Sequence, residues 1–305
     1  MKAWVGVTDS DWYRFLRERP HLDEVNFWQP SGGRQFRSLA PGELFLFKLH
    51  HPENYIVGGG LFTHFSIAPS RLAWDAFGEK NGAPTYEVMR QRIQKYKRVP
   101  PSPHEEYEIG CILLTQPVFF ERSDWISAPA DFAKNIVQGK SYDLTTGIGR
   151  ELWASVQERL RAAAVPAYAD AGSVYGDPIL VKQRLGQGTF RLLITDIYQK
   201  RCSVTGEKVL PVLQAAHIRP VSEGGTHRVD NGLLLRSDVH TLFDRGYVTV
   251  APDLRVMVSS RLKKDFDNGE HYYQYEGREI WAPSTATDRP SNLFLEWHRD
   301  EIFLG

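Results

Sequence analysis

Four side chains in the second half of the sequence have types and spacings that suit metal-assisted chemistry. An apolar run ends at His217, and a loop that contains Glu223-Gly224-Gly225 follows it. Asn231 precedes a second apolar run, and His240 and Asp244 stand four residues apart. Residues at that spacing share one face of a helix. A hairpin followed by a helix would therefore bring His217 beside a metal ion that the helix holds.

The order, spacing and flanks of His217, Asn231 and His240 resemble those of the HNH nuclease family, whose fold is called ββα-metal. The resemblance runs from about residue 184 to 250. It implies hydrolysis of phosphodiesters with His217 as the general base, since an imidazole titrates near pH ~6.5. It also implies that Asn231 orients this histidine and fastens the loop, and that His240 binds the metal. A lone strand histidine is more often a core residue, so the prediction depends on all three together.

The sequence departs from much of the family at Ala216, where an acid or a second histidine usually precedes the base and binds the metal. Asp244, one helical turn after His240, is the predicted second ligand. The alternative is a carboxylate that anchors the end of the helix. A single ion with few protein ligands indicates magnesium or manganese, and imidazole also admits nickel or zinc.

Positive charge near these residues suits a polyanionic substrate. The formal net charge of the chain is zero, but residues 182–219 contain several lysines and arginines. A nucleic-acid-binding protein of this composition needs such a local basic face. Arg219 and Arg236 flank the predicted site and are candidates for phosphate contacts, although ordinary surface ion pairs explain them equally well.

Composition bounds the class of protein. The 305 residues are 42% hydrophobic and 24% charged, as in ordinary globular proteins. Two distant cysteines, Cys111 and Cys202, exclude a disulfide framework and a four-cysteine zinc site. Many HNH proteins brace the hairpin with a zinc ribbon, so here packing alone must hold it. We find no signal-peptide pattern and no apolar run long enough for a membrane span, and a cytoplasmic protein is expected.

The first half of the chain predicts a small, strongly bent sheet with helices. Apolar runs at 44–49 and 55–65 indicate strands, and the glycines at 58–60 would let neighbouring strands approach closely. Residues 70–77 and 85–96 have helical patterns. The entry at Pro41-Gly42-Glu43 and the strand after it are similar to the PUA-like barrels, which include the EVE, ASCH and SRA domains.

These patterns predict an α+β protein with two domains. Residues 1–160 would form a PUA-like bent β-barrel with helices that reads nucleic acid. An alanine-, glycine- and proline-bearing segment, 161–180, is the predicted linker. Residues 181–305 would form the ββα-metal HNH nuclease domain, with a further hairpin around Pro252-Asp253.

A PUA-like domain joined to an HNH domain resembles the modification-dependent restriction endonucleases. That resemblance implies that a flipped cytosine carrying a methyl or hydroxymethyl group sits in an aromatic pocket of the first domain. The candidate walls are aromatic residues, any of which could instead be ordinary core. Two amides in an apolar run would read the base edge, because a buried polar group needs a partner. The six candidates are Asn26, Trp28, Gln29, Phe36, Tyr55 and Trp125.

Three hypotheses about function follow. The first is a metal-dependent DNA endonuclease that is directed to modified DNA. The second is a nuclease of the same chemistry whose first domain binds unmodified nucleic acid or a nucleotide signal. The third is a binding module for DNA without catalysis. A nuclease with one site needs a second copy to cut both strands, so a homodimer is expected.

Overall fold

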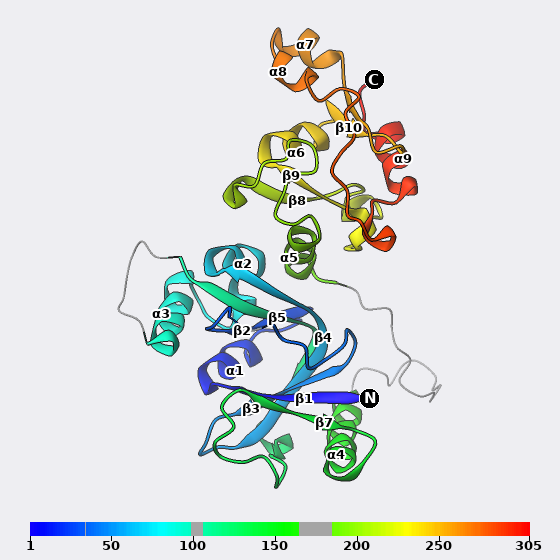
Figure 1. The fold of residues 1–305 in the computed structure, drawn as a ribbon. Helices are drawn as coiled ribbons and strands as arrows, with labels where there is room; N and C mark the ends of the chain where they lie inside the picture. Colours follow the sequence, from blue (N-terminus) through cyan, green and yellow to red (C-terminus); the bar gives the residue numbers. More distant parts are fainter. Residues whose placement is uncertain (34, 99–105, 165–184) are drawn as a thin grey trace. The chain divides into compact units, whose positions relative to one another are not determined.

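The computed structural model of the chain contains two compact units, Met1–Gln183 and Arg184–Gly305. It describes residues 1–33, 35–98, 106–164 and 185–305. The predicted linker begins inside a helix that ends at Ala164. Its remaining residues, 165–180, lie outside the described ranges, as does Lys182 of the basic segment. Both units combine helices with sheet, which confirms the predicted α+β class (Figure 1).

The first unit is built on one mixed sheet with the strand order β2-β5-β4-β3-β1-β7, and β6 pairs with β4. β1 and β3 are parallel, and the other neighbours are antiparallel. The strands are β1 (Lys2–Thr8), β2 (Glu24–Gln29), β3 (Leu44–Leu49), β4 (Tyr55–Pro69), β5 (Glu108–Phe119), β6 (Ile126–Ser127) and β7 (Gly139–Asp143). Among the described residues this order is open, with β2 and β7 at its two ends, so the sheet does not close as the predicted barrel would.

The long strand β4 carries the bend that the glycines predicted. Its pairing with β5 shifts register twice, between Gly59 and Leu61 and between Phe62 and His64. A Cβ atom on Gly58 would lie 2.2 Å from the carbonyl oxygen of Val118. Any larger residue at this position would therefore push the two strands apart, which explains the glycine.

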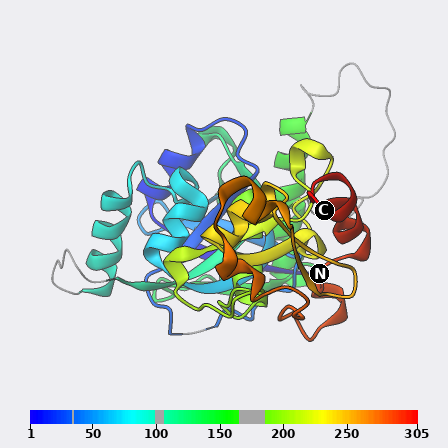
Figure 2. The ribbon, with the colours of Figure 1, turned by 90° about the horizontal axis from the view of Figure 1, so that it is seen from above.

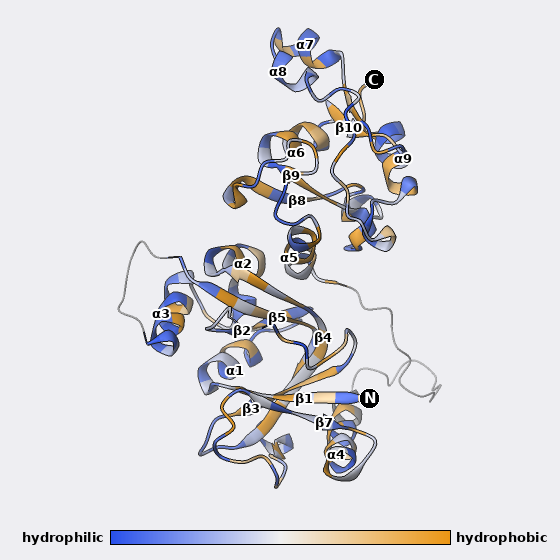
Figure 3. Ribbon diagram, in the orientation of Figure 1, coloured by the Kyte–Doolittle hydropathy of each residue, from blue (hydrophilic) through white to orange (hydrophobic). Residues whose placement is uncertain are grey.

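Helices cover both faces of this sheet. Alternate side chains of β3 are therefore buried on opposite sides of the sheet. Phe45 and Phe47 pack in the cluster that contains Trp12 of α1, whereas Leu46 packs in the cluster that contains Leu152 of α4. The strands carry hydrophobic segments, orange in Figure 3, while α3 mixes both kinds of residue. The helices of this unit are α1 (Ser10–Arg17), α2 (Ser70–Phe77), α3 (Tyr86–Lys97) and α4 (Gly147–Ala164).

The second unit is organised around the hairpin of β8 (Leu213–His217) and β9 (Gly232–Arg236). α5 (Gln187–Ile197) and α6 (Ser237–Asp244) pack on the hairpin and share one hydrophobic core with it. The predicted second hairpin is also present, as antiparallel β10 (Val248–Val250) and β11 (Val256–Val258). α9 (Asn292–Glu301) lies beside β10 (Figures 1 and 2). Two short helices, α7 (Arg261–Phe266) and α8 (Glu270–Tyr273), precede it.

Cys202 has a structural place in this unit. Its buried sulfur accepts hydrogen bonds from the backbone amides of Thr205 and Arg236, at 3.3 and 3.2 Å. These bonds tie the turn before the hairpin to the end of β9. Separately, no helix in the described ranges is both long and apolar enough to cross a membrane.

Candidate active site

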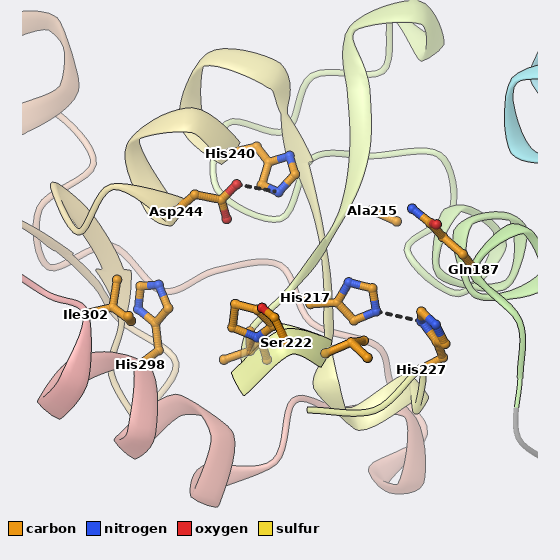
Figure 4. A pocket seen from close by; sticks show the side chains of 12 residues that line it. Gln187, Ala215, His217, Ser222, His227, His240, Asp244, His298 and Ile302 are labelled. Atoms are coloured by element: carbon orange, nitrogen blue, oxygen red, sulfur yellow. Dashed lines mark hydrogen bonds and ion pairs between the residues drawn. The ribbon is translucent and has the colours of Figure 1, made fainter. Parts of the chain in front are cut away.

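The hairpin and the helix after it bring three of the predicted residues to one cavity. β8 and β9 pair from Leu213 opposite Arg236 to His217 opposite Gly232, so His217 stands at the end of its strand. α6 begins directly after β9, and its Val239 and Phe243 enter the core. His240 and Asp244 therefore face away from the core, toward His217 (Figure 4). The cavity measures about 580 Å³ and is lined by His217, His240, Asp244, His227 and Gln187 among others.

The ring of His217 is held on two sides. Its face stacks on Phe190 of α5, with ring centroids 4.1 Å apart and planes 8° apart. Its Nε2 lies 2.9 Å from Nδ1 of His227, within hydrogen-bond distance. Burial, followed by the charges of His227 and His240, lowers the pKa of His217 to about 4. The imidazole is therefore neutral near pH ~7, the form that can accept a proton.

A hydrogen bond orients His240 as metal-ligating histidines are oriented. Its Nδ1 donates to Oε1 of Gln214, at 2.7 Å, which leaves Nε2 as the nitrogen with a lone pair. That Nε2 lies 3.3 Å from Oδ2 of Asp244, so two acceptor atoms face each other. Burial lowers the pKa of His240 and so favours the neutral ring. A cation between these two acceptors would relieve their mutual repulsion.

The donor set suits a divalent ion that keeps much of its water. Within the described ranges, no group of three or more histidine, cysteine or acidic side chains is arranged around a common metal position. His240 and Asp244 are therefore the two candidate ligands in this cavity, and an ion held there would take its other ligands from water and substrate. Magnesium binds in this way, through one or two carboxylates and phosphate oxygens. The imidazole also accommodates manganese, nickel or zinc.

Asn231 is fully buried and fastens the loop between the two strands. Its Nδ2 donates to the carbonyls of Arg219 and Thr226, and its Oδ1 accepts from the amide of Arg219, each at 2.9 Å. A buried side chain that satisfies three backbone groups is costly to replace. Its contacts reach the backbone around His217 rather than the ring itself, so it positions the loop.

The two flanking arginines are engaged within the protein and do not line the cavity. Arg219 Nε donates to the carbonyl of Glu223 at 2.6 Å, and its guanidinium lies 5.0 Å from the ring centroid of Trp297. Arg236 forms a two-pronged pair with Asp238, with both distances 2.7 Å. That pair, opposed by burial, lowers the pKa of Asp238 to about 2. Ion pairing thus accounts for Arg236, and a phosphate contact by either arginine stays a prediction.

The strand geometry explains why Ala216 carries no ligand. Ala215 and His217 line the cavity, whereas Ala216 between them is fully buried in the core. Successive side chains of a strand point to opposite faces. A polar ligand at position 216 would therefore have to enter the apolar core in this register.

Three residues of the site were not predicted from the sequence: His227 and His298, which line the cavity, and Gln214, which holds His240. His227 has one available signal, a histidine in the loop between two of the motif residues. Gln214 has none, because only the folded hairpin places it under the helix. His298 lies in α9, far along the chain, and donates from Nε2 to the carbonyl of Phe243 at 3.1 Å.

We expect His298 to make the stability of the second unit depend on pH. Burial, opposed by its bond to Phe243, lowers the pKa of this ring from 6.5 to about 4. The unfolded chain therefore binds one more proton between these values. The contribution of the neutral His298 ring to the free energy of unfolding is complete above pH 6.5 and is lost as the pH falls toward about 4. Because His298 is only 2% exposed, the full loss of this stabilisation amounts to roughly 3 kcal/mol.

Urea denaturation of the full chain at about pH 7 and about pH 5 measures this loss. The matched variant is His298→Gln, which retains a donor toward Phe243 and does not titrate. The unfolding midpoint of this variant should lie at a lower urea concentration at both pH values, since the ring stacked on Phe243 is gone. Its midpoint should shift less with pH than that of the wild type, and an equal shift would contradict the assignment.

The first unit has a cavity of its own, and two of the predicted base-pocket residues line it. This cavity measures about 810 Å³, and Trp28 and Gln29 at the end of β2 face it with Tyr96 of α3. The indole of Trp28 donates to the carbonyl of Asn81 at 3.0 Å. Asn26 is buried behind this contact and donates to the side chain of Asn81 at 2.9 Å. Asn26 therefore supports Trp28 and does not line the cavity itself.

The other three predicted pocket residues lie elsewhere in the first unit. Phe36 packs edge-on against Trp4 in the core, with ring centroids 5.4 Å apart. Tyr55 and Trp125 contact each other, with centroids 5.7 Å apart. Trp125 also donates to the hydroxyl of Tyr13 at 3.2 Å. None of the three is among the residues that line the cavity beside Trp28.

Comparison with known proteins gives similarities to several solved structures. The Y47F mutant of the ASCH protein from Zymomonas mobilis has a TM-score of 0.34 and 12% identity, covering 51% of this chain and 99% of that chain. The unmutated protein has a TM-score of 0.32 and 11% identity, covering 50% and 94%. The modification-dependent TagI restriction endonuclease has a TM-score of 0.28 and 15% identity, covering 93% and 77%. No curated protein matches the chain.

One family model matches the sequence. Residues 202–251 match HNH_2, described as HNH endonuclease. The matched range contains β8, β9, α6 and β10, and so includes His217, Asn231, His240 and Asp244. The hairpin of the second unit and the helix that follows it are therefore similar in sequence to the HNH endonuclease family.

Proposed function

We propose that the protein is a metal-dependent endonuclease that hydrolyses phosphodiesters of DNA, with His217 as its general base. The observation that carries this proposal is the shared cavity of His217, at the end of β8, and the His240–Asp244 pair of α6. A base and a candidate cation site within one cavity are what phosphodiester hydrolysis requires. The match of residues 202–251 to the HNH endonuclease model supports this reaction class.

Five residues in and beside the cavity have defined parts in this mechanism. His240 and Asp244 would hold a divalent ion, which when bound would supply positive charge near the phosphate oxygens. His217, neutral because it is buried, takes the proton of the attacking water. Gln214 fixes the ring of His240, and Asn231 fixes the loop behind His217.

Plasmid digestion tests the proposal. Wild-type protein should convert supercoiled plasmid to nicked or linear forms with magnesium or manganese, and a chelator should stop the reaction. Cutting of cytosine-modified plasmid alone supports direction by the first unit, and equal cutting of both plasmids supports a nuclease without that restriction. Binding without cutting under every metal condition would sink the catalytic proposal and leave a DNA-binding module.

We further propose that the cavity of the first unit holds a modified cytosine extruded from DNA. Its lining combines aromatic surface, from Trp28 and Tyr96, with polar groups at Gln29 and Asp9. The rings of Trp28 and Tyr96 are 6.3 Å apart, and the hydroxyl of Tyr96 donates to Asp9 at 3.0 Å. Extrusion of a base costs a few kcal/mol, and stacking on such rings offsets that cost.

Replacing Trp28 with alanine should weaken binding to modified DNA by about 10- to 100-fold, since stacking of a base on an aromatic ring contributes ~1–3 kcal/mol. Fluorescence anisotropy in the absence of divalent ions measures binding without cleavage. The matched control is Tyr55→Ala, which removes a partly exposed aromatic outside the cavity. If Tyr55→Ala weakens binding as much as Trp28→Ala, the base does not sit beside Trp28.

A further inference from the structure

His227 is the direct partner of the proposed base. It lies in the loop between β8 and β9, half-buried, with its Nδ1 2.9 Å from Nε2 of His217. The two rings are tilted by 56°, with centroids 5.0 Å apart. Within the described ranges, no other side chain forms a hydrogen bond with the His217 ring. The contact is thus specific to this pair, and the proposed mechanism has not used it.

The contact decides which nitrogen of His217 is basic. One proton is shared between two nitrogens, so either His217 donates from Nε2 or His227 donates from Nδ1. In the first case Nδ1 of His217 has a free lone pair. In the second case Nδ1 of a neutral His217 carries the proton and cannot accept another. Figure 4 shows His240 and Asp244 on the side of the His217 ring away from His227, so the chemistry needs the first case.

The first arrangement, in which His217 donates to His227, also gives the two histidines the more stable tautomers and hydrogen bonds. It places both rings in the Nε2–H form, which is the favoured form of neutral histidine in water. His217 then donates to His227, and the Nε2–H of the half-exposed His227 remains free to reach solvent. Both N–H groups gain acceptors in this way, as partly buried donors require.

The loop holds His227 firmly enough to serve this purpose. Asn231 binds the carbonyl of Thr226, the residue before His227, at 2.9 Å. The amide of Gly225 donates to the carbonyl of Pro220, also at 2.9 Å. Phe190 stacks on His217 and lies 5.8 Å from the His227 ring. The buried amide and the aromatic face therefore fix both partners at once.

We propose that His227 is a positioning residue that accepts the Nε2–H of His217 and thereby leaves Nδ1 of His217 free to take the proton of the attacking water. The inference rests on the proposed nuclease function. In the step itself the O–H bond of water breaks, an N–H bond forms at Nδ1, and the water oxygen bonds to phosphorus. The bond from phosphorus to the leaving sugar oxygen breaks, and that oxygen takes a proton from solvent. His227 loses and gains no bond, and it continues to accept from Nε2 while His217 is charged.

Two variants of His227 separate positioning from bulk. His227→Phe retains the ring and removes the acceptor, whereas His227→Asn places an amide oxygen near the position of Nδ1. We expect His227→Phe to lower kcat by about 10- to 100-fold, within the range for general-base catalysis, with KM for DNA unchanged. His227→Asn should recover most of that loss. Equal losses in both variants, or none in His227→Phe, would overturn the proposal.

The protonation of each ring nitrogen can be measured directly by NMR, whether or not the protein cuts DNA. In ¹⁵N spectra of the metal-free full chain, His217 should show a protonated Nε2 and a bare Nδ1. His227→Phe should shift both signals toward the average of the two tautomers, and His227→Asn should restore them. A protonated Nδ1 in the wild type overturns the role of His227 even if cleavage is observed. The expected spectra in a protein that never cuts DNA would sink the nuclease function and keep the tautomer assignment.

Discussion

Replacing His217 with alanine will reduce DNA cleavage by about 100- to 10,000-fold, the range over which a general base contributes. The reason is local, because this ring shares the cavity with the His240–Asp244 pair. DNA binding should change little, since the ring is partly buried and stacks on Phe190 rather than facing solvent broadly. Cleavage is measured as the rate of nicking of supercoiled plasmid, and binding by gel shift without divalent ions.

The control is His271→Ala, which removes an exposed histidine from α8 of the same unit. It should cut at the wild-type rate. Because loss of the His217 ring also removes packing against Phe190, the melting temperature of each variant is measured beside its activity. A folded His217→Ala protein that cuts as fast as His271→Ala would remove His217 from the mechanism.

The part of the site that the sequence predicted is the part set by local geometry. His240 and Asp244 share a helix face because they are four residues apart, and His217 ends a strand because its apolar run ends there. The strand pairing then needs no information beyond the pattern of apolar residues. The class α+β, the two hairpins and the helix between them follow from the same patterns.

The missed residues depend on tertiary placement that no spacing encodes. His227 meets His217 only because the loop is tied by Asn231, and Gln214 reaches His240 only because α6 packs over the hairpin. The base-pocket prediction had the same difficulty in the first unit. Trp28 lines a cavity while Tyr55 does not, and strand register rather than aromatic character decides this.

Substitutions of the proposed metal ligands should have the second large effect. His240→Ala should lower the affinity for manganese by more than the 10- to 100-fold that a residue behind a ligand typically contributes. Asp244→Asn should lower it too, since the amide removes the negative charge. Gln214→Ala should show the loss of about 10- to 100-fold expected from freeing the ring of a ligating histidine. Titration of the full chain with manganese, followed by electron paramagnetic resonance, measures all three.

The Asp244→Asn variant separates the two interpretations of Asp244, as a metal ligand or as an anchor for the end of the helix. If Asp244 binds the ion, Asp244→Asn weakens manganese binding and raises the metal concentration needed for cleavage. If it only anchors the end of α6, the variant binds manganese like the wild type and melts at a lower temperature. Ser222→Ala is the matched control, because it lines the same cavity and should leave manganese affinity unchanged. The Gln214→Ala variant tests which nitrogen of His240 binds the ion. The Oε1 of Gln214 can affect the ion only by holding Nδ1 of His240. If the effect of Gln214→Ala vanishes in the His240→Ala background, the metal is bound by Nε2 of that ring.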